Sequence, residues 1–271
     1  METTFRSPLV DLFRRGEVSA DVRLLAARGA LAPRAHEQLA LLVLLHDDRD
    51  AEVAAAARRT VDGLPGPALA AFLARPDVSM EVRSFFAARG VVPDASHAVD
   101  ASAPLLENEE GAPPEIDLVE QGATGGAGVR GTDAERRRQL STLTIPERIK
   151  VAMRGSREQR AVLVRDPNRL VALAVLSSPK LSGSEVEGFA RMANVSDDVL
   201  RIIGTNRAWT KNYAVVAALA RNPKTPPAVS LSLTGRLNER DLKLLAVDRN
   251  IPEGLRAAAR KAVAAGSARR K

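Results

Sequence analysis

The sequence predicts an all-α fold, built as two short helical-repeat modules joined by a flexible acidic linker. Hydrophobic residues make up 45% of the 271 residues, yet aromatic residues make up only 3%. The core must therefore consist mainly of Ala, Leu and Val. Ala favours closely packed helices, whereas strands favour aromatic and β-branched residues. Apolar residues also recur at helical spacing in many short stretches, each of which stops at Gly, Pro or Asp.

The charge changes along the chain in a way that predicts its domains. Residues 1–93 carry 12 Arg, no Lys and 12 acidic residues, and residues 94–131 carry one Arg and eight acidic residues. Residues 132–271 carry 27 Lys and Arg against 13 acidic residues, and all seven Lys of the chain lie there. Such steps in charge indicate domain boundaries. We expect an N-terminal helical module at 1–93, a linker at 94–131, a basic helical-repeat module at 132–265 and a basic tail at 266–271.

The first module is expected to contain six short helices, because six of its stretches have apolar residues at helical spacing. These stretches are SPLVDLFRR, ADVRLLAARG, HEQLALLVLLH, DAEVAAAARRTV, GPALAAFLA and MEVRSFFAARG. Residues 15–23 (RGEVSADVR) recur as residues 75–83 (RPDVSMEVR), with five identities in nine positions. This internal repeat favours a module built from one repeated helical unit.

The segment 94–131 is rich in Ala, Gly, Pro and acidic residues and has no sustained period, so we expect a disordered linker. It contains a G-x-G-x-x-G motif at Gly126, Gly128 and Gly131. A dinucleotide site would need a buried strand before these glycines, and the charged segment EIDLVEQ does not supply one. The acidic linker could fold back onto the basic module as a tethered competitor. A linker that is extended by its own repulsion is the simpler expectation.

Three capping-box patterns predict helix starts in the basic module. The three pairs of residues are Thr144 with Glu147, Ser156 with Gln159, and Ser184 with Glu187, and the first pair has Pro146 in the first turn. A shift of this segment against itself by 44 residues gives nine identities across 39 positions. The pairs are Asn168 with Asn212, Val171 with Val215, Ala174 with Ala218, Pro179 with Pro223, Lys180 with Lys224, Asn194 with Asn238, Asp197 with Asp241, Leu200 with Leu244, and Asn206 with Asn250. A period of 44 lies in the range of helical repeats that stack into solenoids.

Several phrases of the sequence resemble a known class of repeat protein. ALAVLSSPKLS, FARMANVSDDVLRIIGTN, AALARNPKTP and LAVDRNIPEGLRAAA resemble the Asn-Pro-punctuated units of leucine-rich repeat variant proteins, and more broadly HEAT repeats. DDRDAEVAAAARRTV is similar to the second helix of a HEAT repeat. The resemblance implies a HEAT-like α-solenoid with a curved binding platform, whose partners range from proteins to nucleic acids. Some variant-repeat proteins are joined to an iron–sulfur module, but a chain without Cys cannot supply its thiolates.

Catalytic motifs are not found, so we expect no enzyme, no catalytic residues and no cofactor. His36, His46 and His97 are scattered and are expected at surface or cap positions, and no H-E-x-x-H, G-x-S-x-G or phosphate-binding G-x-x-x-x-G-K-[ST] motif occurs. Helical-repeat DNA glycosylases are similar in fold class only, because no arrangement of aromatics and an acid can be matched to theirs.

The acidic cluster HDDRD could suggest a cation site at Asp47, Asp48 and Asp50. Acidic residues before and within the first turn of a helix stabilise the helix dipole, and this account is simpler. We therefore expect no metal site there.

The lack of Cys excludes disulfides and thiolate metal sites, and it fits a reducing compartment. The N-terminal METTFRSPLVDLF lacks the charged-then-apolar order of a signal peptide. The longest apolar run, LALLVLL at residues 39–45, is far shorter than a membrane span. We expect a cytoplasmic protein without membrane insertion.

The stretch NRAWTKNY at residues 206–213 contains the only Trp and the only Tyr of the chain. In a structural interpretation, Trp209 and Tyr213 lie four apart on one face of a helix start and fill the seam between adjacent repeats. Thr210 would then cap the helix and Asn206 would close the preceding turn. In a functional interpretation, the cations around these aromatics form part of a binding surface, since aromatics and Arg are enriched in interface hot spots. The two interpretations are compatible.

Successive repeats that present their turns on one edge would align cations that are distant in the sequence. We call the resulting set the basic strip and expect it to bind the partner. Its residues are Arg165, Asn168, Arg169, Arg207, Trp209, Lys211, Asn212, Tyr213, Arg221 and Lys224.

The expected function is that of a non-catalytic adaptor whose basic module docks an acidic protein or peptide. Nucleic-acid binding by the same face is the alternative, because an excess of positive charge attracts either partner. The basic module has one Trp, one Tyr and one Phe (Phe189), which is too few to stack a run of bases. Solenoid surfaces commonly bind proteins, so the sequence favours a protein partner, and it assigns no oligomeric state.

Overall fold

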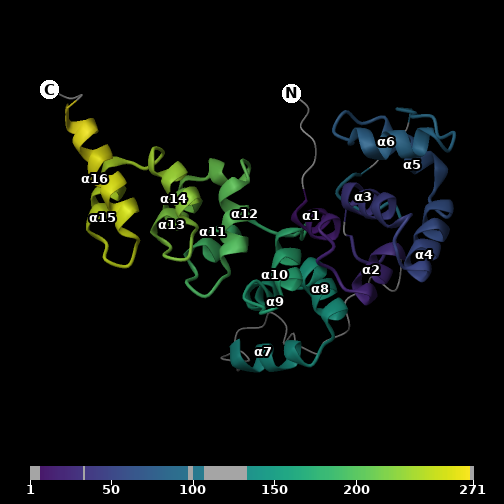
Figure 1. The fold of residues 1–271 in the computed structure, drawn as a ribbon, viewed down its shortest axis with the longest axis horizontal. Coiled ribbons are helices and arrows are strands. Elements are labelled where there is room, and N and C mark those ends of the chain that lie inside the picture. Colours follow the sequence, from purple (N-terminus) through teal and green to yellow (C-terminus); the bar gives the residue numbers. More distant parts are fainter. Residues whose placement is uncertain (1–6, 33, 97–99, 107–132, 269–271) are drawn as a thin grey trace, which may run out of the picture. The chain divides into compact units, whose positions relative to one another are not determined.

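The fold is all-α, as the composition predicts. The computed structural model describes residues 7–32, 34–96, 100–106 and 133–268, and within these residues it contains helices and no strand (Figure 1). Contacts between Cα atoms divide the chain into two compact units. The first unit comprises Met1–Lys180 and the second unit comprises Leu181–Lys271.

Six helices form the N-terminal part of the first unit, one from each apolar stretch of the sequence. They are α1 (Pro8–Arg14), α2 (Ala20–Ala27), α3 (Ala35–Leu45), α4 (Ala51–Asp62), α5 (Gly66–Leu73) and α6 (Met80–Ala87). Helix α3 contacts α1, α2, α4 and α6, because its sequence is apolar on most of its circumference and must be covered on several sides. Leu39, Leu42, Phe72 and Phe86 form the centre of this core.

Four further helices complete the first unit: α7 (Asp133–Ser141), α8 (Ile145–Arg154), α9 (Arg157–Leu163) and α10 (Arg169–Leu176). Helix α10 packs against α1 and α8, and α8 also contacts α2. All seven residues from Leu170 to Leu176 are buried. A helix that is apolar all round must be enclosed by its neighbours, so α10 joins the helices on both sides of residues 107–132 into one unit.

This packing differs from the expected domain organisation. The expected boundaries placed residues 1–93 and 132–265 in separate modules, whereas the structural division falls at Lys180 and Leu181. The step in charge marks a change of surface composition, but the burial of α10 decides which helices pack together. At the carboxyl end, α16 continues to Ala268, beyond the expected start of the tail at residue 266.

The first part of the expected linker is bound to the first unit and is not free. The buried Gln38 amide donates a hydrogen bond of 2.9 Å to the Leu106 carbonyl and accepts bonds of 2.9 and 3.1 Å from the Leu105 and Leu106 N–H groups. The Ala35 N–H donates to the Ala103 carbonyl at 2.9 Å. Leu105 and Leu106 also pack against the core. Residues 107–132, including the G-x-G-x-x-G glycines, lie outside the described residues.

The second unit contains six α-helices and one 3₁₀ turn among its described residues. They are α11 (Gly183–Arg191), α12 (Asp197–Thr205), the 3₁₀ turn η2 (Trp209–Lys211), α13 (Tyr213–Arg221), α14 (Pro227–Thr234), α15 (Glu239–Val247) and α16 (Glu253–Ala268). From α11 to α14, each helix contacts the helix two places later: α11 with α13, α12 with α14, α13 with α15 and α14 with α16. The helices of the second unit thus pack in a regular pattern, in which alternate helices are neighbours.

Side-chain caps set many of the helix starts, and several match the 44-residue shift. Asn168 Oδ1 accepts from the Leu170 N–H at 2.9 Å at the start of α10, and Asn212 Oδ1 accepts from the Ala214 N–H at 2.9 Å at the start of α13. Helices α11 and α14 begin at Gly183 and Pro227, which are also 44 residues apart.

Two of the three predicted capping boxes are confirmed, and one is displaced. Thr144 with Glu147 and Ser156 with Gln159 form the reciprocal bonds of a capping box. The box expected at Ser184 and Glu187 is instead formed by Ser182 and Glu185. Because α11 begins at Gly183, Glu185 is the residue whose carboxylate reaches back to the Ser182 N–H, at 3.0 Å.

Among the described residues, no helix combines the length and the apolar composition that a membrane span requires.

Candidate functional site

A groove of about 460 Å³ lies in the second unit beside α13. Ala214, Ala217 and Ala218 line its floor, and Arg191, Tyr213 and Arg221 stand around it. Positions 214, 217 and 218 share one face of an α-helix. Their small side chains leave a hollow between α13 and the end of α11. We call this site the α11–α13 groove.

Tyr213, the first residue of α13, is held in place at the groove by α15. Its hydroxyl donates a hydrogen bond to the Asp241 carboxylate and accepts one from the Asn238 N–H at 3.2 Å. Burial of the hydroxyl, and then its bond to Asp241, raise the pKa of Tyr213 above its usual value. The phenol therefore remains a donor at neutral pH, and 41% of Tyr213 is exposed.

Asp241 also forms an ion pair with Arg221, through its other carboxylate oxygen. Only 13% of the Asp241 side chain is exposed, whereas 46% of the Arg221 side chain is exposed. The Asp241 carboxylate is thus less exposed than the Arg221 guanidinium, and it binds both Arg221 and Tyr213.

Arg191 provides the second cation of the groove. It pairs with Glu187 one turn earlier on α11. Again the carboxylate is the more covered partner, since 22% of Glu187 and 65% of Arg191 are exposed. Both ion pairs of the groove therefore present their guanidinium groups to the solvent, and each guanidinium has N–H donors beyond those used in its pair.

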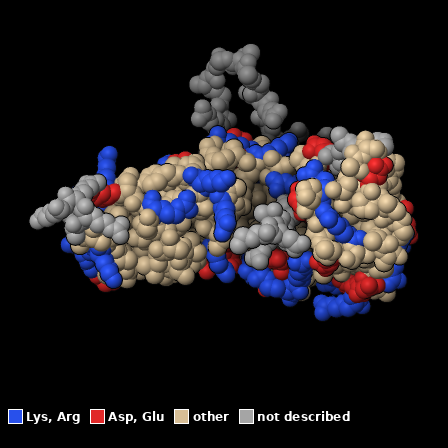
Figure 2. Space-filling view, turned by 90° about the horizontal axis from the view of Figure 1, so that it is seen from above, with Lys and Arg blue, Asp and Glu red and all other residues tan. Residues whose placement is uncertain are grey.

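Arg207, Lys211 and Lys224 are exposed residues of the basic strip that lie outside the groove lining. They form no ion pair with any residue that the structure describes. Together with Asn212, Tyr213 and Arg221 they give the second unit six exposed members of the strip. Figure 2 shows separate groups of Lys and Arg side chains spaced over one face of this unit, with uncharged surface between them.

The stretch NRAWTKNY forms a compact turn and not one helical face. Trp209 lies in η2 and is half-buried, and Asn212 separates it from α13. The Asn206 amide oxygen accepts from the Ala208 N–H at 2.9 Å, so Asn206 does close the preceding turn. The cap of α13 is Asn212 and not Thr210, whose hydroxyl donates back to the Asn206 carbonyl at 2.9 Å. The expected shared helical face of Trp209 and Tyr213 is wrong because a new helix begins between them.

Three members of the basic strip belong to the first unit and have structural partners there. The Arg169 guanidinium lies 2.6 Å from the Glu17 carboxylate, and the Arg165 guanidinium donates to the Ala161 carbonyl at 3.0 Å. Asn168 caps α10. The α11–α13 groove therefore uses only second-unit residues of the strip.

Two charged residues that shape the groove were not among the expected site residues: Arg191, which lines it, and Asp241, which binds Tyr213 and Arg221. The 44-residue shift pairs Asp241 with Asp197 and so marks it as a repeated helix-start residue. That signal does not reveal that its carboxylate holds Tyr213 and Arg221 from another helix.

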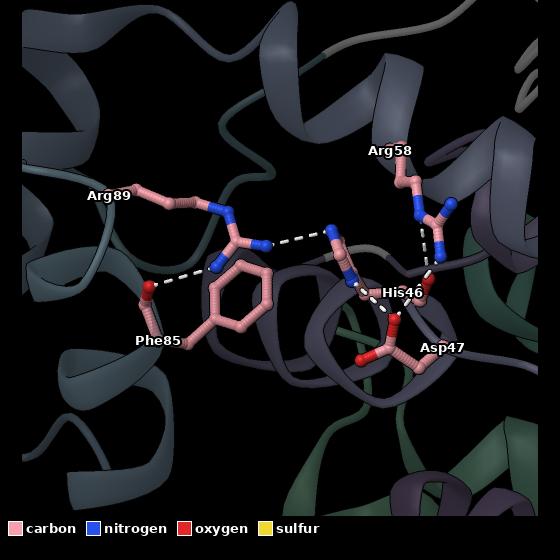
Figure 3. Close-up of polar contacts among 5 residues, drawn as sticks. All are labelled: His46, Asp47, Arg58, Phe85 and Arg89. Carbon is pink, nitrogen blue, oxygen red and sulfur yellow. Dashed lines mark hydrogen bonds and ion pairs between the residues drawn. The ribbon is translucent and has the colours of Figure 1, made fainter.

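Asp47 of the HDDRD cluster is engaged with neighbouring side chains, as Figure 3 shows. Its carboxylate lies 3.0 Å from His46 Nδ1 and accepts from Arg58 at 3.2 Å. Arg89 stacks on the Phe85 ring at 3.6 Å and donates to His46 Nε2 at 2.7 Å. Because Nε2 faces a donor, Nδ1 carries the proton and donates to Asp47, and this bond lowers the pKa of Asp47. The arrangement joins the end of α3 to α4 and α6.

The other two aspartates of the cluster also have structural roles. Asp48 pairs with Arg23 at 3.0 Å, and both side chains are almost fully buried. Asp50 caps α4 by accepting from the Glu52 N–H at 3.0 Å. Within the described part of the chain, no group of side chains is arranged as a metal site. The structure thus gives each carboxylate of HDDRD a partner within the protein.

Comparison with known proteins adds no further information about the site. No family model, curated protein or solved structure matches the chain. The resemblance to leucine-rich repeat variant and HEAT proteins therefore stays a prediction from the sequence.

Proposed function

We propose that this protein is a non-catalytic adaptor that docks an acidic protein or peptide in the α11–α13 groove. The observation that carries the proposal is the difference in exposure within the two ion pairs at the groove. The guanidinium groups of Arg191 and Arg221 are outermost, and their carboxylate partners are covered beneath them. A partner that approaches this face therefore meets positive charge.

The chemistry of the groove suits a carboxylate carried on a narrow backbone. Arg presents a planar fork of N–H donors that matches a carboxylate. The alanine floor of α13 leaves room for a main chain to approach closely. The Tyr213 ring, with its hydroxyl held by Asp241, offers a rigid apolar surface to the part of the partner beside the carboxylate.

Long-range attraction also favours an acidic partner. Residues 181–271 contain 16 Lys and Arg against eight Asp and Glu, a net charge of +8. Such an excess speeds the encounter with an acidic protein and weakens with added salt.

The architecture proposed for the second unit is a HEAT-like α-solenoid of leucine-rich repeat variant type. Two observations support it: the contacts between alternate helices from α11 to α16, and the helix starts that follow a 44-residue shift. A stack of this kind exposes the ends of successive helices along one edge. The adaptor is proposed to meet its partner in the cytoplasm.

The test is a titration of the full chain with a fluorescent peptide of alternating Glu and Leu residues. A peptide with Lys in place of Glu is the matched control, and a duplex and a single-stranded DNA are measured in parallel. The proposal predicts binding of the Glu peptide that weakens with salt, no binding of the Lys peptide, and weaker binding of either DNA.

Two results would overturn the proposal. One is tighter binding of DNA than of the Glu peptide, with a log–log salt slope of about 0.7–0.9 per neutralised phosphate, which would establish the nucleic-acid alternative. The other is no binding of the Glu peptide at about 50 mM salt, where exposed charges are weakly screened.

A further inference from the structure

A second cavity, of about 340 Å³, lies in the first unit between α1, α3, α5 and α6. Helix α3 contacts both α1 and α6, so the walls of this cavity belong to one packed core. The volume falls in the range of small-molecule sites. It corresponds to roughly ten water-sized volumes of about 30 Å³ each. We call this cavity the α1–α6 pocket.

The inner wall of the α1–α6 pocket is apolar. Val10, Phe72, Val78 and Val82 line it, and each is at least 93% buried. The His36 ring meets the Phe72 ring edge to face at 4.7 Å and extends the wall. An apolar body placed here would leave water, and this transfer is favourable by about 25 cal/mol per Å² of apolar surface.

Two basic side chains line the rim of the pocket, and neither carries an unpaired positive charge. Arg14 forms an ion pair of 2.5 Å with Glu81. His36 Nε2 lies 3.4 Å from the Asp77 carboxylate. Burial lowers the pKa of His36, and the nearby Arg75 and Arg34 lower it further, against the opposing effect of Asp77. The imidazole is therefore neutral at pH 7.

Asp11 is the charged group of the rim that has no partner among the described residues. It lines the pocket from the first turn of α1, is exposed, and forms no hydrogen bond or ion pair through its carboxylate with any described residue. Glu81 is matched by Arg14, and Asp77 is matched by Arg75 at 3.0 Å. Among the described residues that line the pocket, Asp11 is thus the charged side chain without an ion-pair partner.

We propose that the α1–α6 pocket binds a small organic amine, with its ammonium group on Asp11 and its apolar body against Phe72 and the valines. The ligand class follows from the combination of one unmatched carboxylate and a deep apolar wall. An ammonium group supplies the donors that Asp11 lacks, and the apolar wall excludes small hydrated cations. This site is separate from the α11–α13 groove and does not depend on its function.

The experiment uses phenethylamine as the probe and the full chain labelled at its valine methyl groups. Two compounds of similar size are the controls: 3-phenylpropionate, which is an anion, and 2-phenylethanol, which is neutral. Titration at about 1–10 mM, followed by NMR, is expected to shift the methyl signals of Val10, Val78 and Val82 with phenethylamine. The anion is expected to bind at least about tenfold more weakly, since it loses a charged hydrogen bond.

The matched variants are D11N and D21N. Asp21 lies in the first turn of α2, as Asp11 lies in the first turn of α1, but it does not line the pocket. D11N should weaken phenethylamine binding by about tenfold, and D21N should leave it unchanged. Both changes are at exposed positions and should leave the helical circular dichroism spectrum intact.

Three outcomes would overturn the proposal. They are the absence of methyl shifts at about 10 mM phenethylamine, equal binding of the amine and the anion, and equal loss of binding in D11N and D21N. The first would show that the cavity takes no amine of this size. The others would show that Asp11 does not select the charge of the ligand.

Discussion

The Ser7 hydroxyl donates a hydrogen bond of 2.6 Å to Glu37 Oε1 inside the first unit. Ser7 stands at the N-cap of α1, but its hydroxyl makes this bond and does not cap the helix. Glu37 is 1% exposed. Burial raises the pKa of its carboxyl, and the bond from Ser7 and the charge of Arg34 oppose this. The folded state therefore holds the proton of Glu37 more tightly than the unfolded chain does.

The raised pKa of Glu37 predicts a pH-dependent stability of the first unit. The stabilisation by this group is complete below the pKa of an unfolded Glu, about 4.3. It is lost as the pH rises through the higher folded-state pKa. E37Q keeps an acceptor for Ser7 and cannot ionise, so its Tm should exceed that of the wild type at about pH 7.5. A gain of about 1 kcal/mol raises the Tm by about 2–4 °C in a protein of this size.

The measurement is thermal unfolding by circular dichroism at about pH 4 and pH 7.5. The advantage of E37Q should shrink at the lower pH. E52Q is the matched control at an exposed position in the first turn of α4. It removes a carboxylate that favours the helix dipole, so it should not raise the Tm at about pH 7.5. An equal Tm difference for E37Q at both pH values would mean that Glu37 does not titrate differently in the folded state.

Asp48 and Arg23 form a buried ion pair, and its loss should be costly. Their side chains are 9% and 8% exposed, and Arg23 also donates to the Val18 carbonyl at 2.8 Å. D48A leaves the guanidinium buried without its partner, which should reduce the free energy of unfolding by about 3–5 kcal/mol. E81A removes an exposed partner of Arg14 and should cost less than about 1 kcal/mol. Urea unfolding measures both variants. A similar small cost for D48A and E81A would show that the buried pair is not maintained in solution.

Gly204 lies where α12 packs tightly against α14. A Cβ added there would lie 2.3 Å from Val229 Cγ1, whereas a Cβ at Gly188 of α11 would meet nothing within 4 Å. G204A should therefore destabilise the second unit by about 1–3 kcal/mol through overpacking. G188A should stabilise it by about 0.5–1 kcal/mol, because Ala is the better helix former. The double variant G204A/V229A should recover part of the loss. If V229A recovers none of the loss, the destabilisation by G204A does not come from contact with Val229.

The sequence predicts the helices well because their signals are local. The low aromatic content excludes a sheet core, and caps such as Thr144, Asn168 and Asn212 fix helix starts through hydrogen bonds to residues two or three positions away. The misplaced box at Ser184 shows the limit of such patterns. In SGSEVE two boxes are possible two residues apart, and packing of Val186 and Phe189 into the core favours the earlier one.

Domain boundaries and site partners depend on contacts that are distant in the sequence. The sequence of α10, RLVALAVL, indicates a helix buried all round, yet it does not name α1 as a helix that covers it. In the same way, Asp241 reaches Tyr213 and Arg221 from α15, and no spacing rule connects them. The residue types around Trp209 therefore predicted Tyr213 and Arg221 as site residues. The roles of Arg191 and Asp241 depend on contacts that only the structure shows.

The direct test of the account is the affinity of the Glu peptide for two variants with the same change in charge. R191Q/R221Q removes both outer cations of the α11–α13 groove, and R240Q/R249Q removes two exposed cations elsewhere in the second unit. Fluorescence anisotropy at fixed salt should show a loss of at least about tenfold for R191Q/R221Q, and less than about threefold for R240Q/R249Q. Equal losses in the two variants would show that net charge alone attracts the peptide, and would contradict a docking site in the groove.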